Sequence, residues 1–277
     1  MRRLRFLLTG AVLAALGLSR GAPARAQQLP PMGDSAVARL DASPRHGEWV
    51  TIAAGSGDSV RAWVSYPERR DKAAVVVMVH EIFGLTDWVR SVADQLAAEG
   101  FIAVVPDLLS GKGPNGGGTE SVDQQEAIRL IGTLSPEEIQ RRLTAAAAYG
   151  EALPAAQARV ATIGFCWGGG KSFLAATFIP GIRGAVVYYG TSPDSATLAR
   201  VAAPVLGLYG GDDARVVATV APAQRELQRL GRRYEVAIYD GAGHGFLRDQ
   251  AGRDGANRRA AEQAWPRTIR FLREVTR

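Results

Sequence analysis

The sequence predicts an α/β fold, in which one mostly parallel sheet is covered by helices on both faces in a single domain. Two patterns predict this fold. Apolar, strand-like runs alternate along most of the chain with longer helical stretches, which is typical of parallel strands joined by helical crossovers. Several runs, such as AAVVVMV at 73–79, are apolar throughout, as strands must be when helices cover both faces of the sheet.

The strand-like runs are rich in Val, Ile and aromatic residues, which favour strands. They are 48–53, 60–66, 73–80, 101–106, 159–165, 184–190, 204–210 and 234–240. The helical stretches are 87–100, 135–153, 169–178, 217–231 and 258–277. Ser135 and Pro136 give the second of these a capping residue and a proline at its first helical position. The glycine-rich stretch at 110–119 is predicted to be a surface loop, and it lacks the spacing of a phosphate-binding loop.

Residues 1–26 are predicted to be a signal peptide. The basic start MRRLR is followed by the apolar run FLLTGAVLAALGL and then by APARA, in which Ala24 and Ala26 have the spacing of a signal-peptidase site before Gln27. The apolar run is too short to span a bilayer comfortably, and an uncleaved anchor and a buried helix are the alternatives to a signal peptide. We therefore expect a periplasmic or secreted protein with no stable membrane span after cleavage. Arg2 and Arg3 leave both the general and the twin-arginine export routes open.

The net charge of +6 does not indicate nucleic-acid binding. Five arginines and no acid lie in the first 26 residues, so the remaining chain carries a net charge of +1. Its arginines are scattered rather than clustered, which gives a nucleic acid little electrostatic support. Residues 27–46 have no sustained periodicity and are predicted to be an extended tether. The domain is predicted to span 47–277.

The only cysteine of the chain, Cys166, lies in the stretch ATIGFCWGGG at 161–170. A lone cysteine after an apolar strand is usually a packing residue. Here, however, Gly164 and Gly168 give the spacing of the nucleophile turn of α/β-hydrolases, with cysteine in the serine position. Glycines at these positions let the backbones pass closely at a strained turn, and the positive end of the following helix favours a thiolate. The pattern predicts a nucleophilic cysteine.

A nucleophilic cysteine needs a base and an acid that orients the base. Of the three histidines, His46 precedes the first strand and is expected to be solvated. His80 ends an apolar strand and is expected to be packed or to orient a loop. His244, in DGAGHGF after the last strand, stands where the base belongs in the order nucleophile, acid, histidine. Asp212 and Asp213 follow the preceding strand, and either qualifies as the acid from its position.

Five short motifs together resemble those of the dienelactone hydrolase family. They are HEIFGL at 80–85, PDL at 106–108, GFCWGG at 164–169, GGDD at 210–213 and GAGHGF at 241–246. Each motif alone is modest evidence, whereas their combination is specific and extends over residues 47–277. The resemblance implies the α/β-hydrolase fold and hydrolysis of a carboxylic ester or lactone.

The resemblance also implies roles for individual residues. It selects Asp213 rather than Asp212 as the acid, so the implied triad is Cys166, Asp213 and His244. Glu81 is implied as a carboxylate that contacts the resting nucleophile and controls its ionisation. From its position alone, Glu81 is equally compatible with a plain salt bridge at the end of a strand.

The oxyanion hole and the substrate-binding groups are likewise implied by the resemblance. The backbone N–H groups of Ile82 and Trp167 would form the oxyanion hole, which agrees with the general rule for this fold. Family members that bind the dienelactone carboxylate use two arginines. Arg248 matches one of them, but Gly111 stands in place of the other. Lys112, next to it, is a weaker substitute because lysine lacks the bidentate fork of arginine.

The expected function is therefore an exported hydrolase that cleaves a carboxylic ester or lactone through a Cys-His-Asp triad and a thioester intermediate. We expect a small-molecule substrate, no cofactor and no metal. The sequence does not determine the oligomeric state, for which a monomer is favoured. Two alternatives remain open. One is a catalytically silent α/β-hydrolase-fold binding protein. The other is a different cysteine enzyme, such as an acyltransferase or a thiol-dependent reductase, although a reductase normally needs a second, resolving cysteine.

Overall fold

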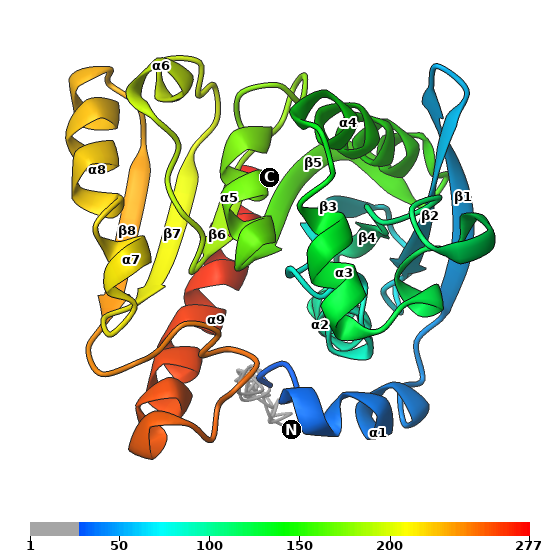
Figure 1. The fold of residues 1–277 in the computed structure, drawn as a ribbon, viewed down its shortest axis with the longest axis horizontal. Coiled ribbons are helices and arrows are strands. Elements are labelled where there is room, and N and C mark those ends of the chain that lie inside the picture. Colours follow the sequence, from blue (N-terminus) through cyan, green and yellow to red (C-terminus); the bar gives the residue numbers. More distant parts are fainter. Residues whose placement is uncertain (1–27) are drawn as a thin grey trace, which may run out of the picture.

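The computed structural model describes residues 28–277, so the predicted signal peptide lies outside the described residues. Eight strands form one sheet in the order β1-β2-β4-β3-β5-β6-β7-β8 (Figure 1). They are β1 (Gly47–Gly55), β2 (Asp58–Ser65), β3 (Ala73–Val79), β4 (Ile102–Pro106), β5 (Ala156–Phe165), β6 (Ala185–Tyr188), β7 (Val205–Gly210) and β8 (Tyr234–Tyr239). The β1–β2 and β2–β4 pairs are antiparallel and the other pairs are parallel. The predicted mostly parallel sheet is confirmed.

Helices cover both faces of the sheet. Buried residues of α1 (Ala36–Asp41), α2 (Asp87–Ala98) and α9 (Ala256–Val275) pack on one face. The other face is covered by α3 (Gln124–Ile131), α4 (Pro136–Ala152), α5 (Trp167–Ala175) and α8 (Val220–Arg229). The two remaining α-helices among residues 28–277, α6 (Ser195–Leu198) and α7 (Ala214–Val217), are each a single turn long.

The central strands are buried on both sides, as their composition predicts. In β3, Val75, Val77 and Val79 belong to the core under α4, while Val76 and Met78 belong to the core under α2. All five are fully buried. This two-residue period means that an uninterrupted apolar run fills two separate cores at once.

The segment before β1 differs from the extended tether predicted for 27–46. Gly33–Ser35 forms a 3-10 turn and Ala36–Asp41 forms α1, and Ala36 is buried. Such a short helix has little stability of its own, because nucleating a helix is costly. Its packing against the domain decides its conformation, and sequence periodicity over six residues does not reveal that packing.

Helix α3 was not predicted from the sequence, although a local signal for it exists. Asp123 caps the helix by accepting a hydrogen bond from the backbone N–H of Glu126, 2.8 Å away. An Asp followed three residues later by a Glu is a capping pattern at a helix start. The glycine-rich stretch before it holds only 3-10 turns, at Pro114–Gly116 and beginning at Thr119.

The parallel strands bring the predicted site residues to one edge of the sheet. The chain leaves β3 at His80, β5 at Cys166, β7 just before Asp213 and β8 before His244. Because parallel strands end at the same edge, the loops that follow them meet there. None of the helices within residues 28–277 is long and apolar enough to cross a membrane.

Candidate active site

Cys166 occupies the sharp turn that its glycines predict. It joins β5 to α5 with φ 56° and ψ −121°, a conformation that residues other than glycine rarely adopt. A Cβ on Gly164 would lie 2.0 Å from the carbonyl oxygen of Gly168, and a Cβ on Gly168 would lie 2.2 Å from that of His80. Neither position tolerates a side chain, so both glycines are needed to hold Cys166 at the start of the helix.

His244 lies between Cys166 and Asp213. Its Nδ1 is 2.5 Å from Asp213 Oδ2, and the Asp213 side chain is largely buried. Burial lowers the pKa of His244, but hydrogen bonds with Cys166 and Asp213 outweigh it and raise the pKa to about 9. The structure therefore brings the three predicted triad residues together. Asp212, the other candidate, faces outward and accepts a hydrogen bond from Arg253 at 3.2 Å.

Close backbone packing places the histidine loop beside the aspartate loop. A Cβ on Gly210 would lie 2.5 Å from the carbonyl oxygen of Gly243. The N–H of Asp212 donates to the carbonyl of Ala242 at 3.0 Å, which ties the two loops together. The first glycine of the GGDD motif thus allows the approach that aligns His244 with Asp213.

Glu81 is almost completely buried and forms an ion pair with Arg248. Arg248 Nε lies 2.9 Å from Glu81 Oε2, but its N–H is not aligned for a hydrogen bond. Within residues 28–277, no hydrogen bond joins Glu81 to Cys166, which differs from the contact that the family resemblance implies. The reason is electrostatic, because a guanidinium beside a buried carboxylate attracts it more strongly than a thiol does.

Burial raises the pKa of Glu81, and the positive charges of Arg248 and His244 lower it only in part, so that it lies at about 7. The pKa in the folded protein is thus above the ordinary value of 4.5. The contribution of the Glu81 carboxyl group to the free energy of unfolding is therefore fully present below about pH 4.5 and is lost as the pH rises through about 7. Ionised Glu81 is a cost to the fold at alkaline pH.

Glu81→Gln is therefore expected to change the free energy of unfolding more favourably at pH 8.5, where Glu81 is ionised, than at pH 5, where it is protonated. The difference between the two effects should be about 2–3 kcal/mol, since one pKa unit corresponds to about 1.4 kcal/mol. Urea unfolding of both proteins at both pH values measures it. An equal change in the free energy of unfolding at pH 5 and pH 8.5 would contradict the raised pKa of Glu81.

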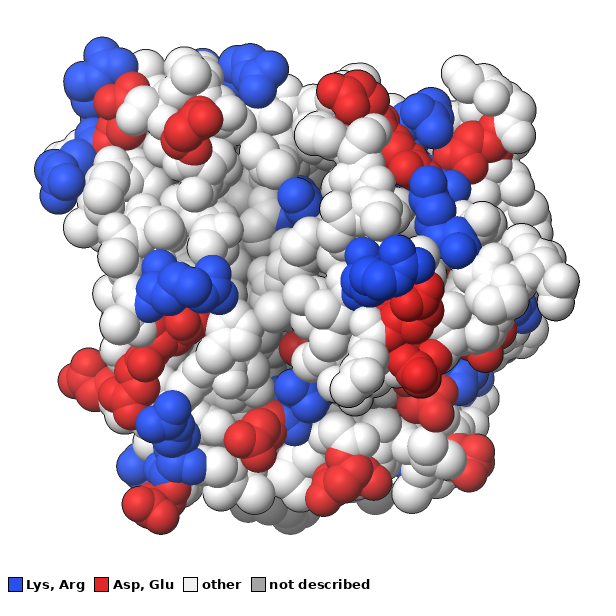
Figure 2. Space-filling model, in the orientation of Figure 1, with Lys and Arg blue, Asp and Glu red and all other residues white. Residues whose placement is uncertain are grey.

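The oxyanion-hole candidates lie at the start of α5 and in the turn that follows Glu81. Trp167 is the first residue of α5, so its backbone N–H has no acceptor within the helix. Ile82 follows Glu81 in a turn in which the N–H of Gly84 donates to the carbonyl of Glu81 at 3.1 Å. Figure 2 shows that the molecule is hollowed near α5 and that basic side chains lie inside the hollow.

His80 and His46 have the non-catalytic positions predicted for them. His80 is fully buried, and burial lowers its pKa. Its Nε2 accepts from the N–H of Leu108 at 3.1 Å and its Nδ1 lies 2.8 Å from the carbonyl of Glu81, so a neutral ring protonated at Nδ1 satisfies both partners. His80 thus fastens two loops of the site. The His46 side chain is exposed.

The two predicted substrate-binding cations differ in their surroundings. Arg248 is part-exposed and its partner is the buried Glu81. Lys112, the weaker candidate, forms a salt bridge with Glu138 on α4 at 2.9 Å. Lys171, which was not selected from the sequence, lies with Nζ 5.2 Å from the centre of the Trp167 ring and makes no salt bridge within residues 28–277.

Tyr189 is a further residue of the site that sequence reasoning missed. It is fully buried, has φ 40°, and its ring centre lies 5.2 Å from that of His244. Burial raises its pKa well above the ordinary value, and the charges of Glu81 and Cys166 raise it further. Its hydroxyl has no hydrogen-bond partner among the described residues. A positive φ at a bulky residue has no signature in the sequence, where Tyr189 reads as part of a strand.

Comparison with known proteins shows the family to which the chain belongs. The model of the dienelactone hydrolase family matches residues 60–276. The chain belongs to the dienelactone hydrolase family. It is 30% identical over 255 residues to a Saccharolobus solfataricus protein named "Putative carboxymethylenebutenolidase", covering 80% of this chain and 96% of the relative. It is 31% identical over 240 residues to a Bradyrhizobium protein named "Probable 2-oxo-3-(5-oxofuran-2-ylidene)propanoate lactonase", covering 82% and 93%.

The solved structures agree with the sequence comparisons. The "Putative Dienelactone Hydrolase" of Klebsiella pneumoniae superimposes with a TM-score of 0.70 at 26% identity, covering 82% of this chain and 98% of that one. This dienelactone hydrolase family member is a hydrolase with the α/β fold of its relatives. The family match begins at residue 60, so the N-terminal helix α1 and β1 lie outside it.

Proposed function

We propose that the protein is an exported hydrolase that cleaves a carboxylic ester or lactone with Cys166 as nucleophile, His244 as base and Asp213 as the acid that orients it. The observation that carries this proposal is the continuous contact from the cysteine through the imidazole to the buried carboxylate. A pKa of about 9 keeps His244 protonated at neutral pH, which places a cation beside the sulfur, as in an activated cysteine.

The chemical steps follow from this arrangement. The sulfur of Cys166 forms a bond to the substrate carbonyl carbon, and the carbonyl π electrons move to its oxygen. The N–H groups of Ile82 and Trp167 donate to this oxyanion. As the carbonyl re-forms, the alkoxide leaves and takes the proton from His244, which yields a thioester. Water then attacks while His244 removes its proton, and the thiolate leaves with the carboxylic acid as product.

Turnover of p-nitrophenyl acetate and of dienelactone by the purified protein tests the proposal. We expect hydrolysis of at least one of them, with release of the free acid. A catalytically silent binding protein would turn over neither. An acyltransferase would deliver the acyl group to an added alcohol in preference to water, and the product would then be a new ester.

We further propose that, of the two cation positions that the family resemblance implies, only that of Arg248 contributes substantially to a preference for an anionic lactone. Lys112 is engaged by Glu138, and Gly111 cannot supply charge. A charge-assisted hydrogen bond contributes on the order of 1.5–3 kcal/mol, so a missing one weakens the preference for an anion about 10-fold to 100-fold.

Gly111→Arg is expected to raise the ratio of kcat/KM for dienelactone to that for p-nitrophenyl acetate by about 10-fold or more. A Cβ at position 111 meets no atom within 4 Å, but φ is +76°, so any side chain there is strained. Gly111→Gln carries the same strain without the charge and is the matched control. If both variants change the ratio equally, the added charge is not the cause.

We also propose that export is followed by cleavage after Ala26, because the small residues Ala24 and Ala26 flank Arg25 with the spacing of a signal-peptidase site. The mature protein is expected to begin at Gln27. Intact-mass measurement on the periplasmic or secreted fraction of expressing cells tests this. A protein in that fraction that still begins at Met1 would rule out cleavage at this position.

A further inference from the structure

The segment Pro30–Gly33 lies outside the family match and is bonded to the loop that carries Arg248. Gln250, which is buried, donates through Nε2 to the carbonyl of Pro30 at 2.9 Å and to that of Leu247 at 3.0 Å. The indole N–H of Trp88 donates to the carbonyl of Pro31 at 3.0 Å. Two buried side chains of the domain thus hold the carbonyls of two successive prolines.

Gly33 contacts both the main chain and the side chain of Arg248. Its N–H donates to the carbonyl of Arg248 at 3.0 Å. A Cβ on Gly33 would lie 3.2 Å from Arg248 Cγ and 3.7 Å from Cδ, so the aliphatic part of the arginine rests on the glycine. On its far end, the guanidinium lies over the ring of Phe83 at 5.2 Å and pairs with Glu81. Arg248 is therefore held between the N-terminal segment and the buried carboxylate of the site.

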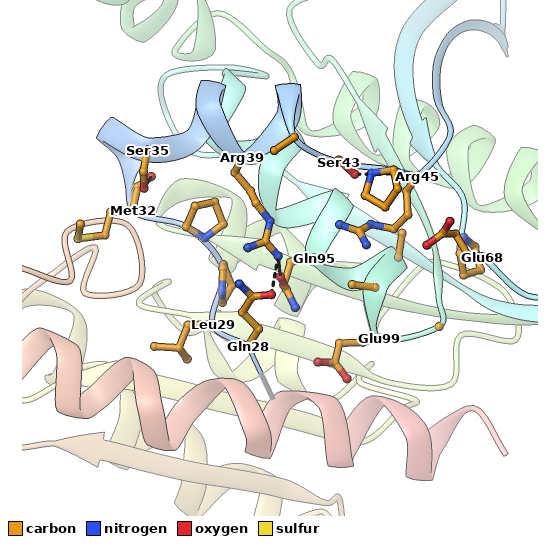
Figure 3. A pocket seen from close by; sticks show the side chains of 18 of the residues that line it. Gln28, Leu29, Met32, Ser35, Arg39, Ser43, Arg45, Glu68, Gln95 and Glu99 are labelled. Atoms are coloured by element: carbon orange, nitrogen blue, oxygen red, sulfur yellow. Dashed lines mark hydrogen bonds between the residues drawn. The ribbon is translucent and has the colours of Figure 1, made fainter. Parts of the chain in front are cut away.

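The rest of the N-terminal region is attached to the domain through α1 and the residues after it, which pack against α2 and bond to it. A cavity of about 1510 Å³ lies between this region and parts of α2 and α9. Figure 3 shows Gln28, Leu29 and Arg39 along it, with Arg39 hydrogen-bonded to Gln28 and Gln95. Next to Arg248, the segment is held by the hydrogen bonds of Gln250, Trp88 and Gly33, while the helix that follows is held by buried Ala36 and its contacts with α2.

We propose that Pro30–Gly33 is a positioning element of the active site, which holds Arg248 in place against Glu81 for binding an anionic substrate. The proposal rests on the proposed function, in which Arg248 binds the substrate anion. An arginine side chain that must be ordered on binding loses conformational entropy. A stem already fixed by Gly33 avoids part of that loss, and the benefit falls on substrates that carry a negative charge.

Gly33→Pro removes the N–H that bonds Arg248 and places the proline Cδ where that hydrogen lay, so position 33 must move away from the Arg248 carbonyl. Gly33 is the first residue of its 3-10 turn, where proline is tolerated, and Met32 has φ −68° and ψ 164°, which a residue before proline adopts. Gly33→Ala retains the N–H and also adds a Cβ, so it is the matched control. Gly33→Pro should raise KM for dienelactone about 5-fold to 10-fold over Gly33→Ala, with kcat and the kinetics on p-nitrophenyl acetate unchanged.

Two further measurements separate this proposal from the proposed function. Amide hydrogen exchange of the peptide covering 245–250 should be faster in Gly33→Pro than in Gly33→Ala, whether or not either substrate is turned over. In an Arg248→Met background, Gly33→Pro should have no further effect on KM for dienelactone. Unchanged exchange, an equal loss on both substrates, or an undiminished effect in the Arg248→Met background would each overturn the positioning role.

Discussion

Cys166→Ala is expected to lower kcat for ester hydrolysis by about 10⁶-fold, the size of loss seen when the nucleophile of a triad is removed. In the proposed mechanism Cys166 carries the acyl group, and the turn between β5 and α5 holds it at the start of the helix. Alanine at this position keeps a Cβ at the same positive φ, so the backbone demand of the turn is unchanged. Steady-state kinetics on the ester that the wild type hydrolyses best would measure the effect.

Alkylation provides an independent test on the native protein. Iodoacetamide should modify Cys166, and activity should fall in parallel with the modified fraction. Because Cys166 is the only cysteine, the mass shift reports this site alone, and Cys166→Ala is the unreactive control. Full activity after complete alkylation, or an unreactive Cys166 in the folded protein, would return the residue to a packing role.

Asp213→Asn is expected to reduce kcat by about 10⁴-fold, in line with the loss of the orienting carboxylate in serine proteases. Asp213 Oδ2 lies 2.5 Å from His244 Nδ1, and an amide there holds the imidazole in the wrong tautomer and no longer stabilises its cation. The pKa of His244, raised in part by this carboxylate, should also fall, and this shift should be visible in the pH dependence of kcat/KM.

Asp212→Asn is the matched control for this prediction. It makes the same chemical change one residue away, where the carboxylate bonds the exposed Arg253. Surface pairs of this kind contribute little to stability, and the Asp212 carboxylate makes no hydrogen bond or ion pair with His244. We expect activity within a few-fold of the wild type. The reverse ranking of the two variants would show that the acid of the site is Asp212.

Local sequence determined the parts of this protein that depend on spacing along the chain. The burial of β3 on both faces can be predicted from its apolar run alone. The turn at Cys166 can likewise be predicted from the spacing of Gly164 and Gly168. The order of Cys166, Asp213 and His244 along alternating strands and helices predicts that they meet, because parallel strands end at one edge of the sheet.

Only the tertiary structure decided which charged groups pair at that edge. Sequence order brings Glu81, Arg248 and Cys166 to the same place, but the pairing of Glu81 with Arg248 depends on the paths of two loops. Lys112 follows Gly111, the position that the family resemblance assigns to an arginine, yet Lys112 pairs with Glu138 of α4. Long side chains reach in many directions, so their partners are fixed by the loops and by the balance of burial and Coulomb attraction.

The N-terminal segment is the clearest case in which local sequence was insufficient. Residues 33–41 carry too short a pattern to predict a helix, and nothing local indicates that Gly33 meets Arg248, more than 200 residues later in the chain. Short segments gain their structure from what they pack against, because the entropy of ordering them exceeds what their own hydrogen bonds supply. The sequence therefore determined the sheet, the turn and the order of the site residues, while long-range packing decided their partners and the conformation of the chain before β1.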